Sequence, residues 1–227
     1  MDLEILWASG SPYSWSVLLA LEVKKLEYKS TLIELLKGEG RTQEFLKMNP
    51  RGKVPVLRDE QTYISESLAI LSYLDKKYSE PSLFGNTPRE AADIMKIISD
   101  YNSYIAPDLN HLISSAFWSK PPNQVGLEEA KQALFYELSN LEKIVSESEW
   151  LAGENISAAD IIIFPFMQLL NRSEAKLQKE IGYTLMFSHT RFPKMYEWMR
   201  RFEALPGYEK TYPPHWEQDK GLNHYIS

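Results

Sequence analysis

The order of strand-like and helix-like stretches limits, more than any other feature, what this chain can fold into. About the first eighty residues alternate short apolar stretches with amphipathic ones, and the rest follows the helical period almost throughout. Strands are expected over residues 3–7, 28–35, 54–58 and 61–64. Helices are expected over residues 12–26, 67–78, 89–118, 127–147, 157–172 and 192–205, with a short one within 38–48. This order predicts a small α/β domain followed by a larger all-α domain.

The boundary between the two domains is expected in the stretch SEPSLFGNTPRE, residues 79–90. It holds two prolines and a glycine and has no hydrophobic periodicity. We therefore predict a first domain over residues 1–79, a linker over 80–88 and a helical domain over 89–227. The final stretch, PGYEKTYPPHWEQDKGLNHYIS, is rich in proline and aromatic residues and is expected to form an irregular tail of the second domain.

The amino-acid composition excludes several kinds of site and partner for this chain. The chain of 227 residues has no cysteine, which excludes disulfides, thiolate metal sites and a cysteine nucleophile. Its net charge of -6 gives no basis for a nucleic-acid partner. No apolar run reaches the ~20 residues of a membrane span, and the N-terminal residues lack signal-peptide features, so a cytoplasmic location is expected. No metal is expected, because no metal-pair spacing joins the four histidines, His111, His189, His215 and His224.

The stretch LWASGSPYSWSVLLALE, residues 6–22, passes from an apolar strand through a glycine directly into a helix. Ser11 and Pro12 suit the N-cap and the first helical position. A helix N-terminus also offers unpaired N–H groups and a positive dipole end to an anion such as a thiolate. A hydroxyl that donates to that thiolate would lower the pKa of the thiol. Ser11 is therefore either a helix cap alone or a thiolate donor, with Ser14 as the second candidate.

Two further stretches leave alternatives open. In RGKVPVL, residues 51–57, Pro55 favours an edge strand or a bulge, whereas a cis Val54–Pro55 bond would offer backbone groups to an extended peptide. In ISESLAIL, residues 64–71, Ser65, Glu66 and Ser67 either cap a helix or bind a ligand. In the second case the Ser67 hydroxyl and helix N–H groups would hold a carboxylate, and Glu66 would pair with an ammonium.

A third stretch, ENISAADIIIFPF at residues 154–166, has a structural interpretation. Ser157 and Asp160 form a variant of the capping box ahead of an apolar run, which predicts the start of a buried helix. Pro165 is expected to bend that helix.

The chain resembles the cytosolic glutathione transferase superfamily over nearly its whole length. The resemblance is carried by SGSPYSWSVLLALE, MNPRGKVPVL, SESLAILSYLDKKY and LAGENISAADI, in the family's order. It implies a thioredoxin-like N-terminal domain, an all-α helical C-terminal domain and a homodimer. Trp7 stands where tyrosine-type members keep a tyrosine, and Ser11 stands where omega-like members keep a cysteine. The chain is therefore similar to the serine-type rho, zeta and tau classes, with a rho-like member favoured.

The resemblance also implies site residues. Ser11 would donate to the thiolate of glutathione, the co-substrate that brings the thiol this chain lacks. Val54, ahead of a cis Pro55, would pair with the cysteinyl part, and Glu66 and Ser67 would hold the γ-glutamyl end. Basic residues near the glycine carboxylate complete the expected set, with a solvated surface charge as the alternative for both: Arg41 and Lys53.

An electrophile site is expected between Tyr13 and the first long helix of the second domain. The helical residues assigned to it are spaced to share one face: Tyr104, Asp108, His111, Ser115 and Trp118. A core face or a dimer contact is the alternative meaning of that face. Tyr212 and Trp216 in the tail either cover the site or anchor the tail.

The predicted function is conjugation of the glutathione thiolate to small hydrophobic electrophiles. Lowering the thiol pKa by one to two units would favour the thiolate by about 1.4–2.8 kcal/mol. One alternative is a glutathione-dependent isomerase or dehalogenase, although Ser11-Pro12-Tyr13 matches the Ser-Ser-Cys run of zeta-type isomerases only in part. Another is a non-catalytic module that binds glutathione or apolar ligands, since a fold does not fix a function.

Overall fold

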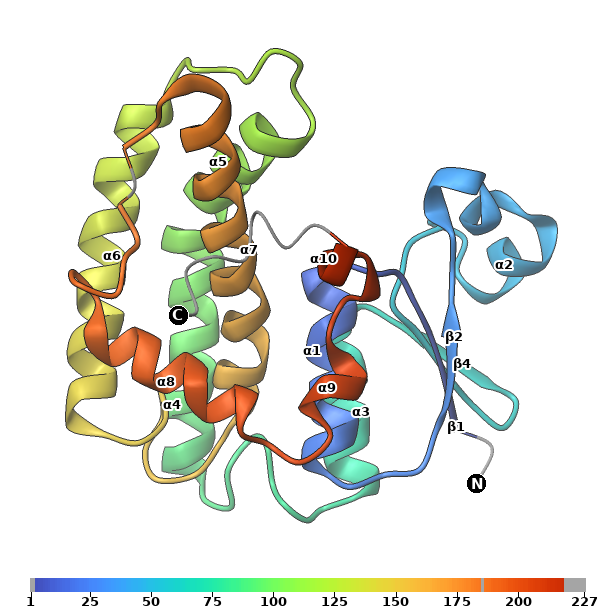
Figure 1. Ribbon diagram of the computed structural model, residues 1–227. Coiled ribbons are helices and arrows are strands. Elements are labelled where there is room, and N and C mark those ends of the chain that lie inside the picture. The colour runs from blue at the N-terminus through green and yellow to red at the C-terminus, as the bar shows by residue number, and fades with distance from the viewer. Residues whose placement is uncertain (1–2, 185, 219–227) are drawn as a thin grey trace. The chain divides into compact units, whose positions relative to one another are not determined.

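The computed structural model describes residues 3–184 and 186–218 and divides them between two compact units (Figure 1). The first unit comprises Met1–Phe84 and Ala204–Gln218, and the second contains Gly85–Glu203. Among the described residues, no helix is both long enough and apolar enough to span a membrane.

The first unit is built on a four-stranded mixed sheet with the order β2-β1-β3-β4. Its strands are β1 (Leu3–Trp7), β2 (Lys29–Leu32), β3 (Val56–Asp59) and β4 (Thr62–Ser65). β1 runs parallel to β2 and antiparallel to β3, and Ile5 lies opposite both Ser30 and Leu57. Every residue of β1 is buried, which fits a central strand covered on both faces. The predicted hairpin is confirmed as β3 and β4.

Three helices complete the first eighty residues of this unit: α1 (Pro12–Val23), α2 (Gln43–Met48) and α3 (Ser67–Lys77). Two short 3₁₀ turns, Leu35–Lys37 and Glu39–Arg41, precede α2. α1 packs against both α3 and a later helix, α9 (Tyr208–Thr211). Its residues from Ser14 to Leu21 are all buried, so the single apolar stripe predicted for it was too narrow.

The segment 204–218 differs from the expected division of the chain. It was assigned to an irregular tail of the helical domain, but it belongs to the first unit and contains α9 and α10 (Pro214–Gln218). Trp15 explains this placement, because its indole N–H donates to Thr211 Oγ1 at 2.9 Å. The rings of Tyr212 and Trp216 stand edge-on to it, with centroids 5.8 and 5.4 Å away. The rest of the predicted tail, residues 219–227 with His224, lies outside the described residues.

The second unit is helical. It contains α4 (Pro88–Asp100), α5 (Ala106–Phe117), α6 (Leu127–Glu147), α7 (Ala158–Ile181) and α8 (Pro193–Glu203), and α5 packs against α6 and α7. The single helix predicted over 89–118 is interrupted by a π-helical turn, Tyr101–Ile105. α7 continues well beyond its predicted end at residue 172, with Pro165 inside it.

The start of α7 is the buried helix start that the sequence predicts. Asp160 is fully buried, and its carboxylate accepts hydrogen bonds from the Ser157 N–H at 2.9 Å and the Ser157 hydroxyl at 2.6 Å. It also accepts from the Leu151 N–H at 2.8 Å and the Trp198 indole at 2.9 Å. Four donors satisfy a carboxylate that would otherwise be costly to bury.

Candidate functional site

Ser11 is the N-cap of α1, and Pro12 occupies the first helical position. The Ser11 hydroxyl oxygen accepts a hydrogen bond from the Ser14 N–H at 3.3 Å, and the residue is half-buried. A serine hydroxyl accepts through its lone pairs and donates its single proton independently. The cap therefore leaves the Ser11 proton available to a ligand at the N-terminus of α1.

Ser14, the second candidate, faces inward. It is fully buried, and its hydroxyl oxygen lies 3.5 Å from the backbone nitrogen of Ala8, on the turn that precedes the helix. Of the two serines, only Ser11 is accessible to a bound molecule.

The Val54–Pro55 peptide bond is cis. β3 begins at Val56 and lies between β1 and β4, so the edge-strand interpretation of Pro55 is wrong. Pro55 is buried, whereas Val54 is half-buried and precedes the paired residues of the sheet.

Glu66 and Ser67 occupy the start of α3. Glu66 has a φ of 71°, a conformation that costs a residue with a side chain about 1–3 kcal/mol. Glu66 is the N-cap residue of α3, but in the described part of the chain its carboxylate makes no capping hydrogen bond. The side chain is exposed instead, and Ser67 is the first helical residue.

Tyr13 links the start of α1 to the start of α3. Its pKa is raised above the ordinary value, first by partial burial and then by the negative charge of Glu66. The two helix starts that the sequence singles out therefore lie within electrostatic reach of each other. Half of the Tyr13 side chain is exposed.

Arg41 and Lys53 come from two turns that touch through their backbones. A Cβ atom on Gly52 would lie 2.6 Å from the Gly40 carbonyl oxygen and 3.2 Å from Arg41 Nη1. Such spacing admits only glycine, and it brings the two exposed cations onto neighbouring turns.

Asn49 is a structural residue of this region that the sequence analysis missed. It is buried, its side-chain amide donates to the Lys53 carbonyl at 2.7 Å, and its side-chain oxygen accepts from the Arg51 N–H at 3.1 Å. It therefore fixes the turn that leads to Val54. The run Asn-Pro-Arg-Gly carries the turn signal that could have identified it.

The residues assigned to the electrophile do not share one face of one helix. Tyr104 lies in the π-helical turn, which adds a residue to the local period and rotates it relative to α5. Ser115 is only 2% exposed, whereas Tyr104 and Trp118 are 60% and 76% exposed. A His111 ring nitrogen lies 2.8 Å from the Val125 carbonyl oxygen. Asp108 is half-buried in the first turn of α5. The prediction of one uninterrupted helical face is therefore wrong at Tyr104, and the role of these residues in binding an electrophile stays a prediction.

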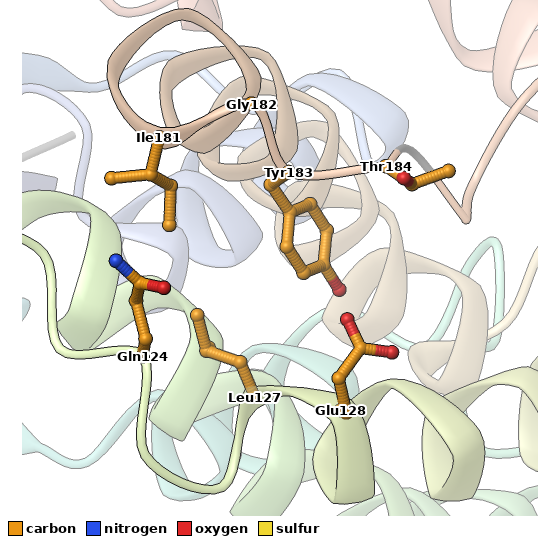
Figure 2. A pocket seen from close by; sticks show the side chains of 7 residues that line it. All are labelled: Gln124, Leu127, Glu128, Ile181, Gly182, Tyr183 and Thr184. Atoms are coloured by element: carbon orange, nitrogen blue, oxygen red, sulfur yellow. The ribbon is translucent and has the colours of Figure 1, made fainter.

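The helical unit has a separate pocket of about 210 Å³ (Figure 2). Its lining does not include any predicted site residue and consists of Gln124, Leu127, Glu128, Ile181, Gly182, Tyr183 and Thr184. Across residues 3–184 and 186–218, no group of three or more potential ligands is placed to hold a metal ion.

One contact near Ser11 joins opposite ends of the sequence. The Ser9 hydroxyl lies 2.5 Å from His215 Nδ1, and these residues are 206 positions apart. No local pattern could have indicated this pair.

Models of known families match both halves of the chain. The model described as "Glutathione S-transferase, N-terminal domain" matches residues 8–82, and "Glutathione S-transferase, C-terminal domain" matches residues 105–206. "Glutathione S-transferase A" of Pleuronectes platessa is 27% identical over 95% of this chain and 93% of its own. "Probable glutathione S-transferase GSTF1" of Oryza sativa subsp. japonica is 32% identical over 86% of this chain and 88% of its own.

Two other similarities extend the comparison. "Probable maleylacetoacetate isomerase 1" of Drosophila melanogaster is 26% identical over 91% of this chain and 79% of its own. The crystal structure of a glutathione S-transferase from the Antarctic clam Laternula elliptica matches with a TM-score of 0.81 and 28% identity over the whole of both chains.

The first unit has a mixed sheet with helix starts around Ser11 and Glu66, and the second unit is helical. Together with the two matching family models, these features define a protein with a thioredoxin-like N-terminal domain and an all-α C-terminal domain. Within that class, the chain belongs to the glutathione S-transferase family, a family of transferases. The predicted resemblance and fold are thereby confirmed, and the rho-like class stays a prediction.

Proposed function

We propose that this protein conjugates the thiolate of glutathione to hydrophobic electrophiles, with Ser11 as the thiolate donor. The observation that carries the proposal is the position of Ser11: its hydroxyl is accessible at the N-terminus of α1, and Ser14 is buried. A thiolate there would receive the Ser11 proton as a hydrogen bond and interact with the positive end of the helix dipole. Both effects lower the pKa of the bound thiol.

The remaining expected contacts suit the parts of glutathione. The backbone of Val54 precedes the paired part of β3 and suits an extended cysteinyl residue. The exposed Glu66 carboxylate suits an ammonium group, and Ser67 with the N–H groups of α3 suits the adjacent carboxylate. Arg41 and Lys53 place two positive charges on neighbouring turns for the glycine carboxylate.

For the electrophile, exposed aromatic side chains are the proposed contacts. Tyr13 exposes half of its side chain beside Ser11, and Tyr104 and Trp118 stay candidates because they are more exposed still. Ser115 and His111 are better explained by burial and by the contact with the Val125 carbonyl. We also propose a homodimer in the cytoplasm, as the family resemblance implies.

The second candidate function is a glutathione-dependent isomerase. It is supported by the similarity to the maleylacetoacetate isomerase relative, and it would use the same thiolate on a narrower substrate. Its weakness is that Ser11-Pro12-Tyr13 matches the isomerase run only in part.

Product analysis separates these functions. Purified protein and glutathione are incubated either with an activated aryl chloride or with a maleyl-type substrate, and products are identified by mass spectrometry. We expect the thioether of the aryl substrate. An isomerised maleyl product without conjugation would support the second candidate, and binding of glutathione with neither product would indicate a non-catalytic module.

A further inference from the structure

The cavity of the helical unit is lined by the first turn of α6 and by the end of α7 (Figure 2). Leu127 and Glu128 are the first two residues of α6. Ile181 is the last residue of α7, and Gly182 is its C-cap. A volume of about 210 Å³ lies below the ~300–1,000 Å³ of sites for drug-sized ligands, so a ligand of this cavity would have only a few carbon atoms.

Tyr183 brings to this cavity a polar group that lacks a partner. The residue is only 6% exposed, and in the described part of the chain its buried hydroxyl makes no hydrogen bond. Figure 2 shows the ring directed from the end of α7 toward α6, with the hydroxyl facing the Glu128 carboxylate. Because a buried donor without an acceptor is costly, this position favours a ligand that accepts a hydrogen bond from Tyr183.

The charged groups around Tyr183 disfavour a charged ligand. Burial raises the pKa of Tyr183, and the nearby carboxyl groups of Glu174 and Glu128 raise it further, so the hydroxyl keeps its proton and acts as a donor. The same carboxylates repel an anion. A cation offers no acceptor to the hydroxyl, and it is repelled by Lys131, whose ammonium lies 5.0 Å from the centre of the Tyr183 ring and 3.6 Å from Glu128. A neutral hydroxyl group suits the site, because its single oxygen both accepts and donates.

We propose that this cavity binds a small neutral polyol, with one ligand hydroxyl between Tyr183 and Glu128. That hydroxyl accepts a hydrogen bond from Tyr183 and donates one to the Glu128 carboxylate. The Glu128 side chain is 68% exposed, so its rotation admits the ligand without disturbing the core. The Gln124 amide offers a donor and an acceptor to a second hydroxyl, and Leu127 and Ile181 line the cavity with apolar atoms for the carbon chain. The site is independent of the proposed function, because none of its residues is assigned to glutathione or to the electrophile.

The test titrates the intact protein with erythritol, a four-carbon polyol, and follows the backbone amide signals by NMR. We expect saturable shifts at the start of α6 and the end of α7. Three probes of similar size should not cause them. Ethylene glycol dimethyl ether has oxygen acceptors but no hydroxyl donor, succinate is an anion, and putrescine is a cation.

Two substitutions each remove one proposed partner of the ligand hydroxyl: Tyr183→Phe and Glu128→Ala. Their matched controls are Tyr136→Phe and Glu129→Ala, at exposed positions of α6 that do not line the cavity. We expect each cavity variant to bind erythritol about two- to tenfold more weakly, with no change in the controls. Tyr183→Phe should also raise the melting temperature of the protein without ligand, because it removes the unpartnered hydroxyl.

Equal erythritol affinities in the wild type and Tyr183→Phe would overturn the inference. Shifts that grow without saturation would also overturn it, because erythritol would then act only as a general solute. A lower melting temperature of Tyr183→Phe without ligand would show that an ordered water already satisfies the hydroxyl, which removes the basis of the proposal. Tighter binding of succinate or putrescine than of erythritol would contradict the neutral character of the ligand.

Discussion

The hydroxyl oxygen of Ser11 lies 3.3 Å from the backbone nitrogen of Ser14 and accepts its hydrogen bond. This contact makes Ser11 a helix cap, which is the structural role that the sequence offers for it. It does not compete with the chemical role, because the cap uses a lone pair and a thiolate would use the proton. The two interpretations of Ser11 are therefore compatible: a change in stability reports on the cap, and a change in conjugation rate reports on the chemical role.

Ser11→Ala removes both roles, whereas Ser11→Thr keeps a hydroxyl and a capping oxygen. We expect Ser11→Ala to lose about 0.5–2 kcal/mol of stability with the cap and to lose most of the conjugation rate. Ser11→Thr should retain most of the stability and a measurable rate. Urea unfolding and steady-state kinetics check both. Ser14→Ala is the control, and a rate loss in it as large as in Ser11→Ala would show that the wrong serine has been assigned.

Replacement of Glu66 is expected to have opposite effects on the stability of the protein and on its binding of glutathione. Its φ of 71° is relieved by glycine, so Glu66→Gly should raise the free energy of unfolding by about 1 kcal/mol. The same change removes the proposed ammonium partner and should raise the KM for glutathione. Glu60, with a φ of 54° in the turn between β3 and β4, offers the matched control. Glu60→Gly should stabilise the protein without changing KM, and an equal rise in KM in both variants would contradict the role of Glu66.

Removal of the buried ammonium group of Lys24 is expected to lower the free energy of unfolding strongly. It donates to Asp75 at 2.9 Å and to the carbonyl oxygens of Tyr78 and Pro81 at 2.6 and 2.7 Å, and its side chain is 0% exposed. Lys24→Met would leave the Asp75 carboxylate without its charge partner, at a cost of about 3–5 kcal/mol. Lys96→Met, which breaks the exposed pair with Asp100, should cost no more than about 0.5 kcal/mol. If urea unfolding showed equal losses of unfolding free energy in Lys24→Met and Lys96→Met, this prediction would be contradicted.

The ionisation of Glu174 is expected to make the stability of the protein depend on pH. Its carboxylate is buried and accepts from the N–H groups of Met186 and Phe187, both at 2.9 Å. Burial raises its pKa from 4.5 to about 7. The folded protein therefore holds a proton that the unfolded chain releases, and stability falls as pH rises from about 4.5 to about 7, by roughly 3 kcal/mol.

Urea unfolding across this pH range tests Glu174. Glu174→Gln should flatten the fall, because the amide does not titrate. Glu180→Gln, at an exposed position on the same helix, should keep it. A wild type whose stability does not fall over this range would show that Glu174 is already ionised.

Local patterns in the sequence were sufficient for much of this fold. The bounds of α6 agree with the prediction, and Ser157 with Asp160 marks the start of α7, because capping and periodicity act within one or two turns. The π-helical turn at Tyr101–Ile105 was not predictable, since its residues fit an uninterrupted helix equally well. It rotates Tyr104 relative to the side chains of α5, so Tyr104 does not continue the face that the sequence spacing predicts.

Contacts between distant parts of the chain account for the other differences. Gly40 and Gly52 make their turns touch, and Trp15 binds the segment around Thr211 to the first unit. No spacing of residues in the sequence indicates either of these two contacts. The same holds for Ser9 and His215, whereas Ser11, Glu66 and Ser67 were recognisable because each lies at a helix start.

The most direct test of the proposed role of Ser11 is the pKa of the glutathione thiol bound to the wild type and to Ser11→Ala. We expect a pKa well below the free value of roughly 8.5 in the wild type and a return toward that value in the variant. Bound glutathione with an unshifted thiol pKa in the wild type would contradict the account, and Ser11 would then be a helix cap alone.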